Sequence, residues 1–262
     1  MVGVDREGVA AARPNFITSD RLVARTTCVL DKDAARHMRV LRLVPGALIG
    51  VRDGQGTVAE GRLSKLTKTQ AHVDLVSVVF VSPFPPVHLL VPVADRDRML
   101  WLAEKACELG CTSWRPVLWH RSRSVSPRGE GIVFQARTRA RMEQALAQSE
   151  GAWLPQIFPE ASPERAALAA PPGDRIVLDP RGLPLVGMSA QSIAVPTTFA
   201  LGPEGGFEGD ELDVLTAAGF RLASIGNTIL RFETAGVSAL AIARTALAGA
   251  TPGAHLSLHG HD

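Results

Sequence analysis

The sequence predicts an α/β protein whose larger part is a parallel sheet covered by helices, preceded by a small β-barrel or sheet. Three observations lead to this prediction. From residue 87 onward, strand-like runs alternate with helix-like runs, which is typical of a parallel sheet with helices on both faces. The N-terminal third instead holds short β-type runs separated by turns. Near the C-terminus, two glycine-bearing loops each join a strand-like run to a helix-like run.

In the N-terminal third, β-type runs occupy residues 47–53, 57–63 and 71–79. Turn-forming pairs such as Pro-Gly and Asp-Gly separate them, and this pattern predicts short strands of a barrel or sheet. One short helix is expected among them, at residues 33–43. The Pro-rich stretch 81–86 is then a linker, because such hinges commonly separate domains.

Beyond the linker, strand-like runs lie at residues 87–93, 114–119, 176–180, 195–201 and 221–225. Helix-like runs lie at residues 99–110, 137–149, 208–220 and 233–247. Their alternation indicates βα units, in which helices connect parallel strands. Gly219 is expected to end the third helix, because glycine commonly follows the last helical turn.

The two C-terminal loops place glycines where a strand passes into a helix. Gly202, Gly205 and Gly206 follow one strand-like run, and Gly226 follows the next. Such glycines let a backbone approach a ligand closely, and N–H groups at a helix start offer hydrogen bonds. The loops match neither the P-loop nor the dinucleotide fingerprint, so an adenosine-type or cationic ligand suits them better than a triphosphate. Two ordinary turns of an α/β domain are the alternative.

Taken together, LGPEGGF at residues 201–207 and IGNTILRFETA at 225–235 closely resemble the paired C-terminal motifs of the RsmE-type 16S ribosomal RNA uridine-N3 methyltransferases, members of the SPOUT superfamily. Further agreement lies in ARHMRVLRLVPG, EKACELGCTSWRPV and RSRSV, so the resemblance covers about residues 14–250. It implies a PUA-like RNA-binding β-barrel domain at residues 14–83 and a SPOUT methyltransferase domain at residues 84–250, with a C-terminal trefoil knot. Knots are so rare that the sequence alone would not suggest one.

The resemblance also implies that S-adenosylmethionine is the cofactor and that both loops bind it. The residues so implied are Leu201, Gly202, Pro203, Glu204, Gly205, Gly206, Ile225, Gly226, Asn227, Ile229, Leu230 and Arg231, with Leu178 and Asp179 as walls of the same pocket. Backbone groups of the loops would hydrogen-bond the adenine edge, which gives affinity without phosphate recognition.

Methylation of uridine N3 sets the chemical requirements. The enzyme must expose the base, help the imide proton leave, and hold the methyl donor in line. Arg231 is predicted to be catalytic, because a guanidinium near the uracil carbonyls would stabilise the developing anion. Glu233 would orient Arg231 or hold the loop, and Glu204 would face the methionine amine or the sulfonium. Glu233 has a structural alternative as an acid favoured at a helix N-terminus, and the proton acceptor stays open.

The distribution of charge suits a phosphate-bearing partner. The net charge is only +2, but ten basic and six acidic residues lie within residues 14–83, and six arginines against one glutamate lie within residues 120–141. Such basic segments favour RNA binding, with solvated arginines as the alternative. The predicted RNA-binding residues are His37, Arg39 and Arg42 on the short helix, and Arg121 and Arg123 on a loop. The expected partner is 16S rRNA or the assembled small ribosomal subunit.

Other features exclude several classes of protein. Cys28, Cys107 and Cys111 lack metal-ligand spacing, so buried free thiols and no metal site are expected. No apolar run approaches the length of a membrane span and the N-terminus lacks a signal core, which predicts a cytoplasmic protein with no membrane partner. Residues 1–13 and 252–262 are expected to be loose tails, including the C-terminal histidines.

Three positions depart from the family pattern. Ala147 precedes Gln148 where a glutamate is usual, and Gly151 stands where an arginine is expected. Asp95 takes the place of a common lysine. The loss of these basic residues is expected to weaken RNA binding more than donor binding, unless Arg96 and Arg98 compensate.

Two further points stay open in the sequence. SPOUT sites are generally completed by a second subunit, so the resemblance implies a homodimer; the small residues of the run 235–250 suit close helix packing, although packing within one chain would explain them equally. The alternatives to a uridine-N3 methyltransferase are a related SPOUT enzyme with another RNA target, such as a ribose hydroxyl, and a non-catalytic RNA-binding homologue.

Overall fold

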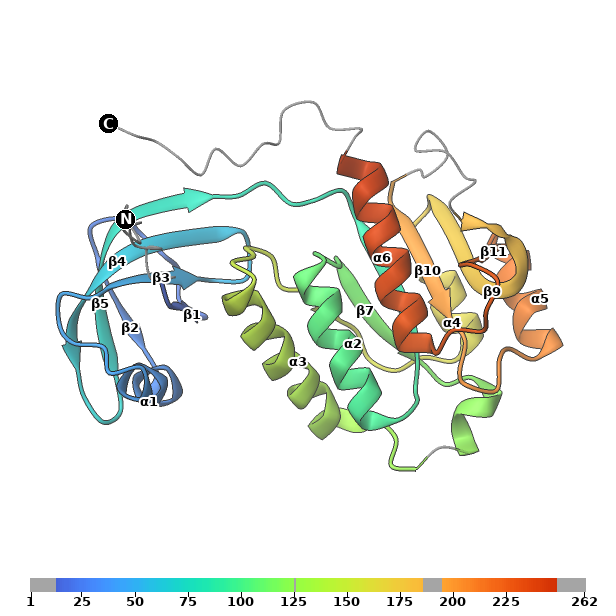
Figure 1. Ribbon diagram of the computed structural model, residues 1–262, viewed down its shortest axis with the longest axis horizontal. Coiled ribbons are helices and arrows are strands. Elements are labelled where there is room, and N and C mark those ends of the chain that lie inside the picture. The colour runs from blue at the N-terminus through green and yellow to red at the C-terminus, as the bar shows by residue number, and fades with distance from the viewer. Residues whose placement is uncertain (1–12, 125, 186–194, 249–262) are drawn as a thin grey trace, which may run out of the picture. The chain divides into compact units, whose positions relative to one another are not determined.

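The computed structural model describes residues 13–124, 126–185 and 195–248 (Figure 1). Its contacts divide the chain into two compact units. The first contains residues 1–82 and 146–153, and the second contains residues 83–145 and 154–262. The sequence did not predict that residues 146–153 group with the first unit. The tails expected at residues 1–13 and 252–262 lie almost entirely outside the described residues.

The first unit is built on a five-stranded sheet with the order β1-β3-β4-β5-β2. Its strands are β1 (Asn15–Ile17), β2 (Thr27–Leu30), β3 (Leu48–Arg52), β4 (Thr57–Leu66) and β5 (Ala71–Phe80). β1 is parallel to β3, and the other pairs are antiparallel. Two register shifts between β4 and β5 are irregularities of the kind that bend and twist a sheet. Among the strands that the structure describes, β1 and β2 are the edges, so the hydrogen-bonded ladder is open between them.

Helix α1 (Lys32–Val40) covers the core of this sheet with Ala35 and Met38, which are fully buried. The Asp31 carboxylate caps its first turn by accepting hydrogen bonds from two backbone N–H groups. The helix ends before the predicted residue 43, because Leu43 N donates to Met38 O and Arg42 N donates to Arg39 O. These bonds form a C-terminal motif that usually holds glycine at the position of Arg42, whose φ is 56°. The prediction that Arg39 and Arg42 share one helix is therefore wrong.

The second unit contains a six-stranded sheet with the order β11-β9-β10-β6-β7-β8. Its strands are β6 (Val87–Pro92), β7 (Ser113–Val117), β8 (Gln156–Ile157), β9 (Asp174–Pro184), β10 (Thr197–Leu201) and β11 (Arg221–Ser224). Every neighbouring pair is parallel, which confirms the predicted α/β class. Since the strands are parallel, β10 and β11 deliver the two glycine-bearing loops at the same edge of the sheet.

Helices cover both faces of this sheet (Figure 1). On one face α6 (Phe232–Ala248) packs against α2 (Arg96–Glu108), and on the other α4 (Pro163–Leu168) packs against α5 (Gly209–Ala217). Gly236 lets α6 lie close to the sheet, because a Cβ there would be 3.0 Å from Leu102 and from Leu201. The small residues of α6 are thus used within one chain.

The remaining sequence expectations concern thiols and membranes. Cys28, Cys107 and Cys111 are free and buried, as predicted. Burial raises the pKa of the Cys107 and Cys111 thiols to about 12, so both stay protonated at neutral pH. Among the described residues, no helix combines the length and apolar character that a membrane span needs.

Candidate functional site

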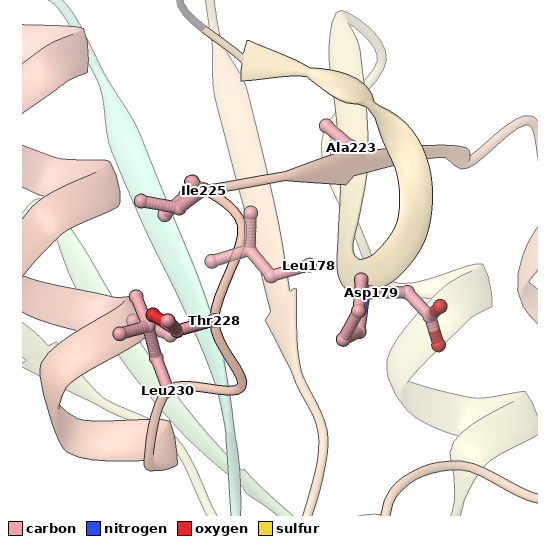
Figure 2. Close-up of a pocket in the computed structure, with 9 residues that line it drawn as sticks. Leu178, Asp179, Ala223, Ile225, Thr228 and Leu230 are labelled. Carbon is pink, nitrogen blue, oxygen red and sulfur yellow. The ribbon is translucent and has the colours of Figure 1, made fainter.

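A pocket lies where β9 meets the loop after β11 (Figure 2). We call residues 201–206 the first loop and residues 225–231 the second loop. The space in the pocket is about 340 Å³, part of it continuous with solvent. Its lining residues are Leu178, Asp179, Pro180, Ala223, Ile225, Gly226, Thr228, Leu230 and Ala235. The structure therefore brings together the second loop and the two predicted wall residues of β9.

An irregularity in β9 shapes one wall of this pocket. β11 pairs with β9 at Val177 and next at Leu183, so the residues between them leave this ladder. The close approach of Gly182 makes the shift possible, because a Cβ at this position would lie only 2.4 Å from Ala223 N. The predicted strand ended at residue 180, whereas β9 continues to Pro184, so the bulge at Gly182 lies beyond the predicted strand.

Asp179 lines the pocket but is already bound within its own turn. Its carboxylate accepts hydrogen bonds from Arg181 N at 2.9 Å, Arg181 Nε at 2.8 Å and Arg181 Nη2 at 2.9 Å. The bonds from Arg181 hold the pKa of the Asp179 carboxyl below its ordinary value. In Figure 2 the carboxylate is turned away from Thr228 and Leu230. The charge of Asp179 is thus paired with Arg181 and not with a group inside the pocket.

The second loop forms the opposite wall and has few contacts of its own. Gly226 has a φ of 71° and no atom within 4 Å of where a Cβ would lie. Thr228, which the sequence prediction omitted, lines the pocket, whereas Asn227 and Ile229 do not. Ile229 is instead 87% exposed. A strand-to-helix loop has no fixed periodicity, so the sequence could not tell which of these side chains turns inward.

The lining residues include no member of the first loop, all of which the structure describes. Side chains occupy the space beside two of its glycines. A Cβ at Gly202 would lie 2.9 Å from the Phe207 ring, and one at Gly205 would lie 2.7 Å from Arg121 Cδ. Gly206 has a φ of 76°, and its N–H donates to Pro203 O at 2.8 Å. These glycines close a compact turn, in contrast to the open approach to a ligand that the sequence suggested.

The short helix η1 (His120–Ser124) and the residue before it hold the first loop in place. Trp119 Nε1 donates to Leu201 O at 3.0 Å, and Arg121 Nη1 donates to Gly205 O. Arg121, predicted to bind RNA, thus makes a contact within the protein. The side chain of Arg123 lies outside what the structure describes.

His120 joins η1 to α5. Its backbone N–H donates to Glu211 Oε1 at 2.7 Å, and its ring Nδ1 lies 3.1 Å from Glu208 Oε2. The hydrogen bond to Glu208 raises the pKa of His120 above its ordinary value. With Asp210, these side chains bring three potential metal-ligand atoms within 4.8 Å of one another. The hydrogen bond to Glu208 accounts for much of this proximity, and such exposed groups are common without a metal.

The three predicted catalytic side chains differ in their surroundings. Arg231 is exposed, and no described residue forms a hydrogen bond or ion pair with its guanidinium. Glu204 forms an ion pair with Arg98. Glu233 is buried, and its Oε1 lies 3.9 Å from Arg98 Nε. Glu233 therefore pairs with Arg98 and not with Arg231. Arg98 was not among the predicted site residues. Its position between a predicted strand and a predicted helix was the sequence signal that could have identified it.

The predicted RNA-binding residues of the first unit are partly engaged. His37 packs edge-on against the Phe16 ring, with the ring centres 5.7 Å apart, and Arg39 Nη1 donates to Thr67 O at 2.5 Å. All three residues, including Arg42, are exposed, and His37 and Arg39 also make the contacts given above.

The departures from the family pattern have structural counterparts. Asp95 caps α2, because its Oδ1 accepts from Asp97 N at 3.1 Å and from Arg98 N at 3.0 Å. Gly151 N donates to Leu146 O at 3.2 Å, and a Cβ at Gly151 would lie 2.7 Å from Leu146 Cδ1. No structural reason is evident for Ala147.

Comparisons with known proteins agree with this geometry. A family model described as an RNA methyltransferase domain matches residues 82–244, and one described as an RNA methyltransferase PUA domain matches residues 30–76. The chain is 28% identical over 243 residues to ribosomal RNA small subunit methyltransferase E of Synechocystis sp., covering 86% of this chain and 75% of that protein. It is 28% identical over 225 residues to the protein of the same name from Mycobacterium bovis, covering 81% of this chain and 84% of the relative.

Among solved structures, similarity extends to a ribosomal RNA small subunit methyltransferase E from Neisseria gonorrhoeae bound to S-adenosyl methionine. The two chains superpose with a TM-score of 0.79 at 28% identity, covering 89% of this chain and 97% of the other. The likeness therefore includes both units of the chain.

Proposed function

Because the chain belongs to the family of the RNA methyltransferase domain, we propose that it transfers the methyl group of S-adenosylmethionine to N3 of a uridine in 16S rRNA. The observation that carries this proposal is the pocket between the second loop and β9. It lies at the carboxyl edge of a parallel sheet, where α/β proteins commonly bind ligands. The similar protein from Neisseria gonorrhoeae, which binds S-adenosyl methionine, supports the choice of cofactor.

The lining of the pocket fits a nucleoside with a sulfonium group. Leu178, Ile225 and Leu230 offer an apolar surface, and Thr228 offers a hydroxyl. The lining contains no lysine or arginine, which argues against a nucleotide whose phosphates would need positive charge. The Asp179 carboxylate is already paired with Arg181, so the lining presents no unpaired charge to the ligand. When bound, S-adenosylmethionine supplies an electrophilic methyl group.

Arg231 has the position and freedom for the chemical step. It follows Leu230 of the pocket wall and directly precedes α6, with no described partner for its guanidinium. A free guanidinium there would stabilise the negative charge that develops on the uracil carbonyl oxygens as N3 loses its proton to solvent. Glu233, which was predicted to orient Arg231 or hold the loop, and Glu204, which was predicted to face the methionine amine or the sulfonium, both face Arg98.

The first unit supports binding to the RNA substrate. We place this binding in the cytoplasm as part of the same proposal. We assign RNA binding to a PUA-like domain at residues 14–83 and methyl transfer to a domain at residues 84–250. Arg42 keeps an exposed side chain on a left-handed backbone, where arginine is less favourable than glycine by about 1 kcal/mol. A side chain retained at such a position supports a functional contact, and phosphate is the partner that its charge favours.

The threading of the second unit as a trefoil knot is part of the same proposal. β9 lies between β10 and β11 in the sheet, so the chain passes across β9 after it leaves β10. A knot is compatible with this crossing, which also occurs in unknotted parallel sheets, so the resemblance to the SPOUT superfamily carries this part of the proposal. An experimental electron-density trace from β9 to α6 tests it, and a trace that can be pulled straight from both ends contradicts it.

A homodimer is the last part of the proposal. The small residues of α6 pack within one chain, so they no longer support a dimer. The support for a dimer is the resemblance to SPOUT enzymes, and Ile229, a large apolar side chain that is 87% exposed in the second loop, is the residue chosen to test it. Light scattering at micromolar concentration should give the mass of a dimer and, for Ile229→Ser, a shift toward the monomer. A monomer in the unaltered protein would contradict this part.

Nucleoside mass analysis tests the proposed reaction. Small ribosomal subunits from a strain that lacks the protein are incubated with the protein and S-adenosylmethionine, and the rRNA is then digested. We expect a methyl group on the uracil base and a product identical to 3-methyluridine. A methyl group on ribose would favour the related enzyme with another target, and donor binding without methyl transfer would favour a non-catalytic RNA-binding protein.

A further inference from the structure

Arg98 lies at a junction of three elements that are far apart in the sequence. It belongs to the first turn of α2, and its guanidinium forms an ion pair with Glu204 of the first loop. Its Nε also lies 3.9 Å from Oε1 of Glu233, in the first turn of α6. One cation therefore faces two carboxylates from two different segments.

Glu233 is buried, so its carboxylate needs a compensating positive charge such as the Arg98 guanidinium. The Glu233 side chain is only 11% exposed, and its Oε2 has no hydrogen-bond partner among the described residues. A buried carboxylate without compensation is unfavourable. The positive end of the α6 dipole offsets part of this penalty, and Arg98 is the cation paired with Glu233.

The position of Glu233 connects Arg98 to the pocket. Leu230 and Ala235, on either side of Glu233 in the sequence, both line the pocket. The turn that carries these two side chains is thus anchored behind the pocket wall by Glu233 and Arg98. Since Arg98 also holds Glu204, the same anchor links the first loop to the wall formed by the second.

From these contacts we infer that Arg98 is a positioning residue for the donor site. It fixes the start of α6, and with it Leu230 and Arg231, relative to the first loop. This inference rests on the proposed function, in which the pocket takes S-adenosylmethionine. It also removes Arg98 from the residues available to RNA phosphate, because its guanidinium already faces two carboxylates.

The choice of arginine follows from the geometry. A planar guanidinium presents several N–H donors in a fixed fork and can serve two carboxylates at once. Lysine keeps the charge but offers a compact ammonium, so it should restore only part of the function. Arg96 provides a matched control, because it lies in the same helical turn and its ion pair is with the neighbouring Asp97 at 3.5 Å.

The test compares Arg98→Ala, Arg98→Lys and Arg96→Ala with the unaltered full-length protein. Calorimetry gives the Kd for S-adenosylmethionine, and steady-state kinetics give kcat and the KM for rRNA. For Arg98→Ala we expect donor binding to weaken about tenfold or more and kcat to fall by a similar factor, with the KM for rRNA within about twofold of its original value. Arg98→Lys should recover part of the loss, and Arg96→Ala should leave the Kd for S-adenosylmethionine unchanged.

Two results would overturn the inference: unchanged donor binding in a folded Arg98→Ala protein, or an increase in the KM for rRNA alone. If Arg98→Ala does not fold, Glu204→Gln weakens the same ion pair from an exposed loop. A loss of donor affinity by about threefold then supports the inference, and an unchanged affinity overturns it. If the unaltered protein itself fails to bind S-adenosylmethionine, the proposed function fails first, which separates the two cases.

Discussion

The two glycine-bearing loops look alike in the sequence, but their glycines have different surroundings. In the first loop, Gly202 and Gly205 are covered by Phe207 and Arg121. In the second loop, Gly226 has open space where a side chain would lie, and the loop lines the pocket. We therefore propose that the first loop is held as a scaffold and that the second presents the surface for the ligand. A shared glycine motif does not imply a shared role.

The largest expected effect concerns Arg231, at the end of the second loop. Replacement of Arg231 by alanine should lower kcat about 100-fold, because the charge that stabilises the developing anion is lost. The free energy of unfolding should stay unchanged, since no described residue bonds the guanidinium. Steady-state kinetics and urea unfolding measure the two quantities. Arg165→Ala, at an exposed arginine of α4, is the control, and a fall in stability equal to the loss of activity would contradict the assignment.

The next effect concerns the first loop and is structural. Gly202→Ala should lower the free energy of unfolding by about 2 kcal/mol, because the new methyl group meets the Phe207 ring and forces the packing to shift. That ring lies edge-on to the buried Trp119, with centres 4.9 Å apart. Gly209→Ala is the matched control, since nothing lies within 4 Å of its Cβ position. If both variants are equally stable, the first loop is not the scaffold described.

A smaller effect separates strain from ligand contact in the second loop. Gly226→Ala should lower the free energy of unfolding by about 1 kcal/mol, because its φ of 71° disfavours any residue with a Cβ. Gly219→Ala, with a φ of 84° and equally open space, should show the same loss. Only Gly226→Ala should also weaken binding of S-adenosylmethionine in calorimetry. Equal donor affinity in the two variants would remove the second loop from the site.

The smallest effect is the pH dependence of the segment that joins the first loop to α5. The pKa of His120 is raised above 6.5 by Glu208, with further contributions from Asp210 and Glu211. Protonated His120 thus favours the fold: the contact contributes fully below about pH 6.5 and is lost as the pH rises through the raised pKa. Hydrogen exchange at Gly205 to Glu208, corrected for its intrinsic rate, should therefore be faster at pH 8 than at pH 6.

The His120→Gln variant should lose this pH dependence while the second loop exchanges alike at both values. A pH dependence that survives in His120→Gln would show that another group controls this segment.

Much of the fold followed from the sequence because its strands are continuous apolar runs. Five of the six parallel strands and the stop at Gly219 were visible as local patterns, as were the helices α2, α3 (Gly131–Gln148), α5 and α6. α2 begins before the predicted residue 99, because Asp95 supplies the cap. The helix α4 was missed although Ser162 and Pro163 carry a helix-start pattern.

The site was less predictable because its contacts join distant segments. No local pattern shows that Arg98 faces Glu204 and Glu233, or that Arg121 covers Gly205. The grouping of residues 146–153 with the first unit likewise depends on tertiary packing. The sequence predicted that both loops bind the donor, and the structure shows that their glycines have different surroundings.

A crystal structure of the protein with S-adenosylhomocysteine tests the central assignment most directly. We expect the nucleoside in the pocket, with its base or ribose against Leu178, Ile225 and Leu230. Density for the ligand elsewhere in the molecule, with this pocket empty, would contradict the account.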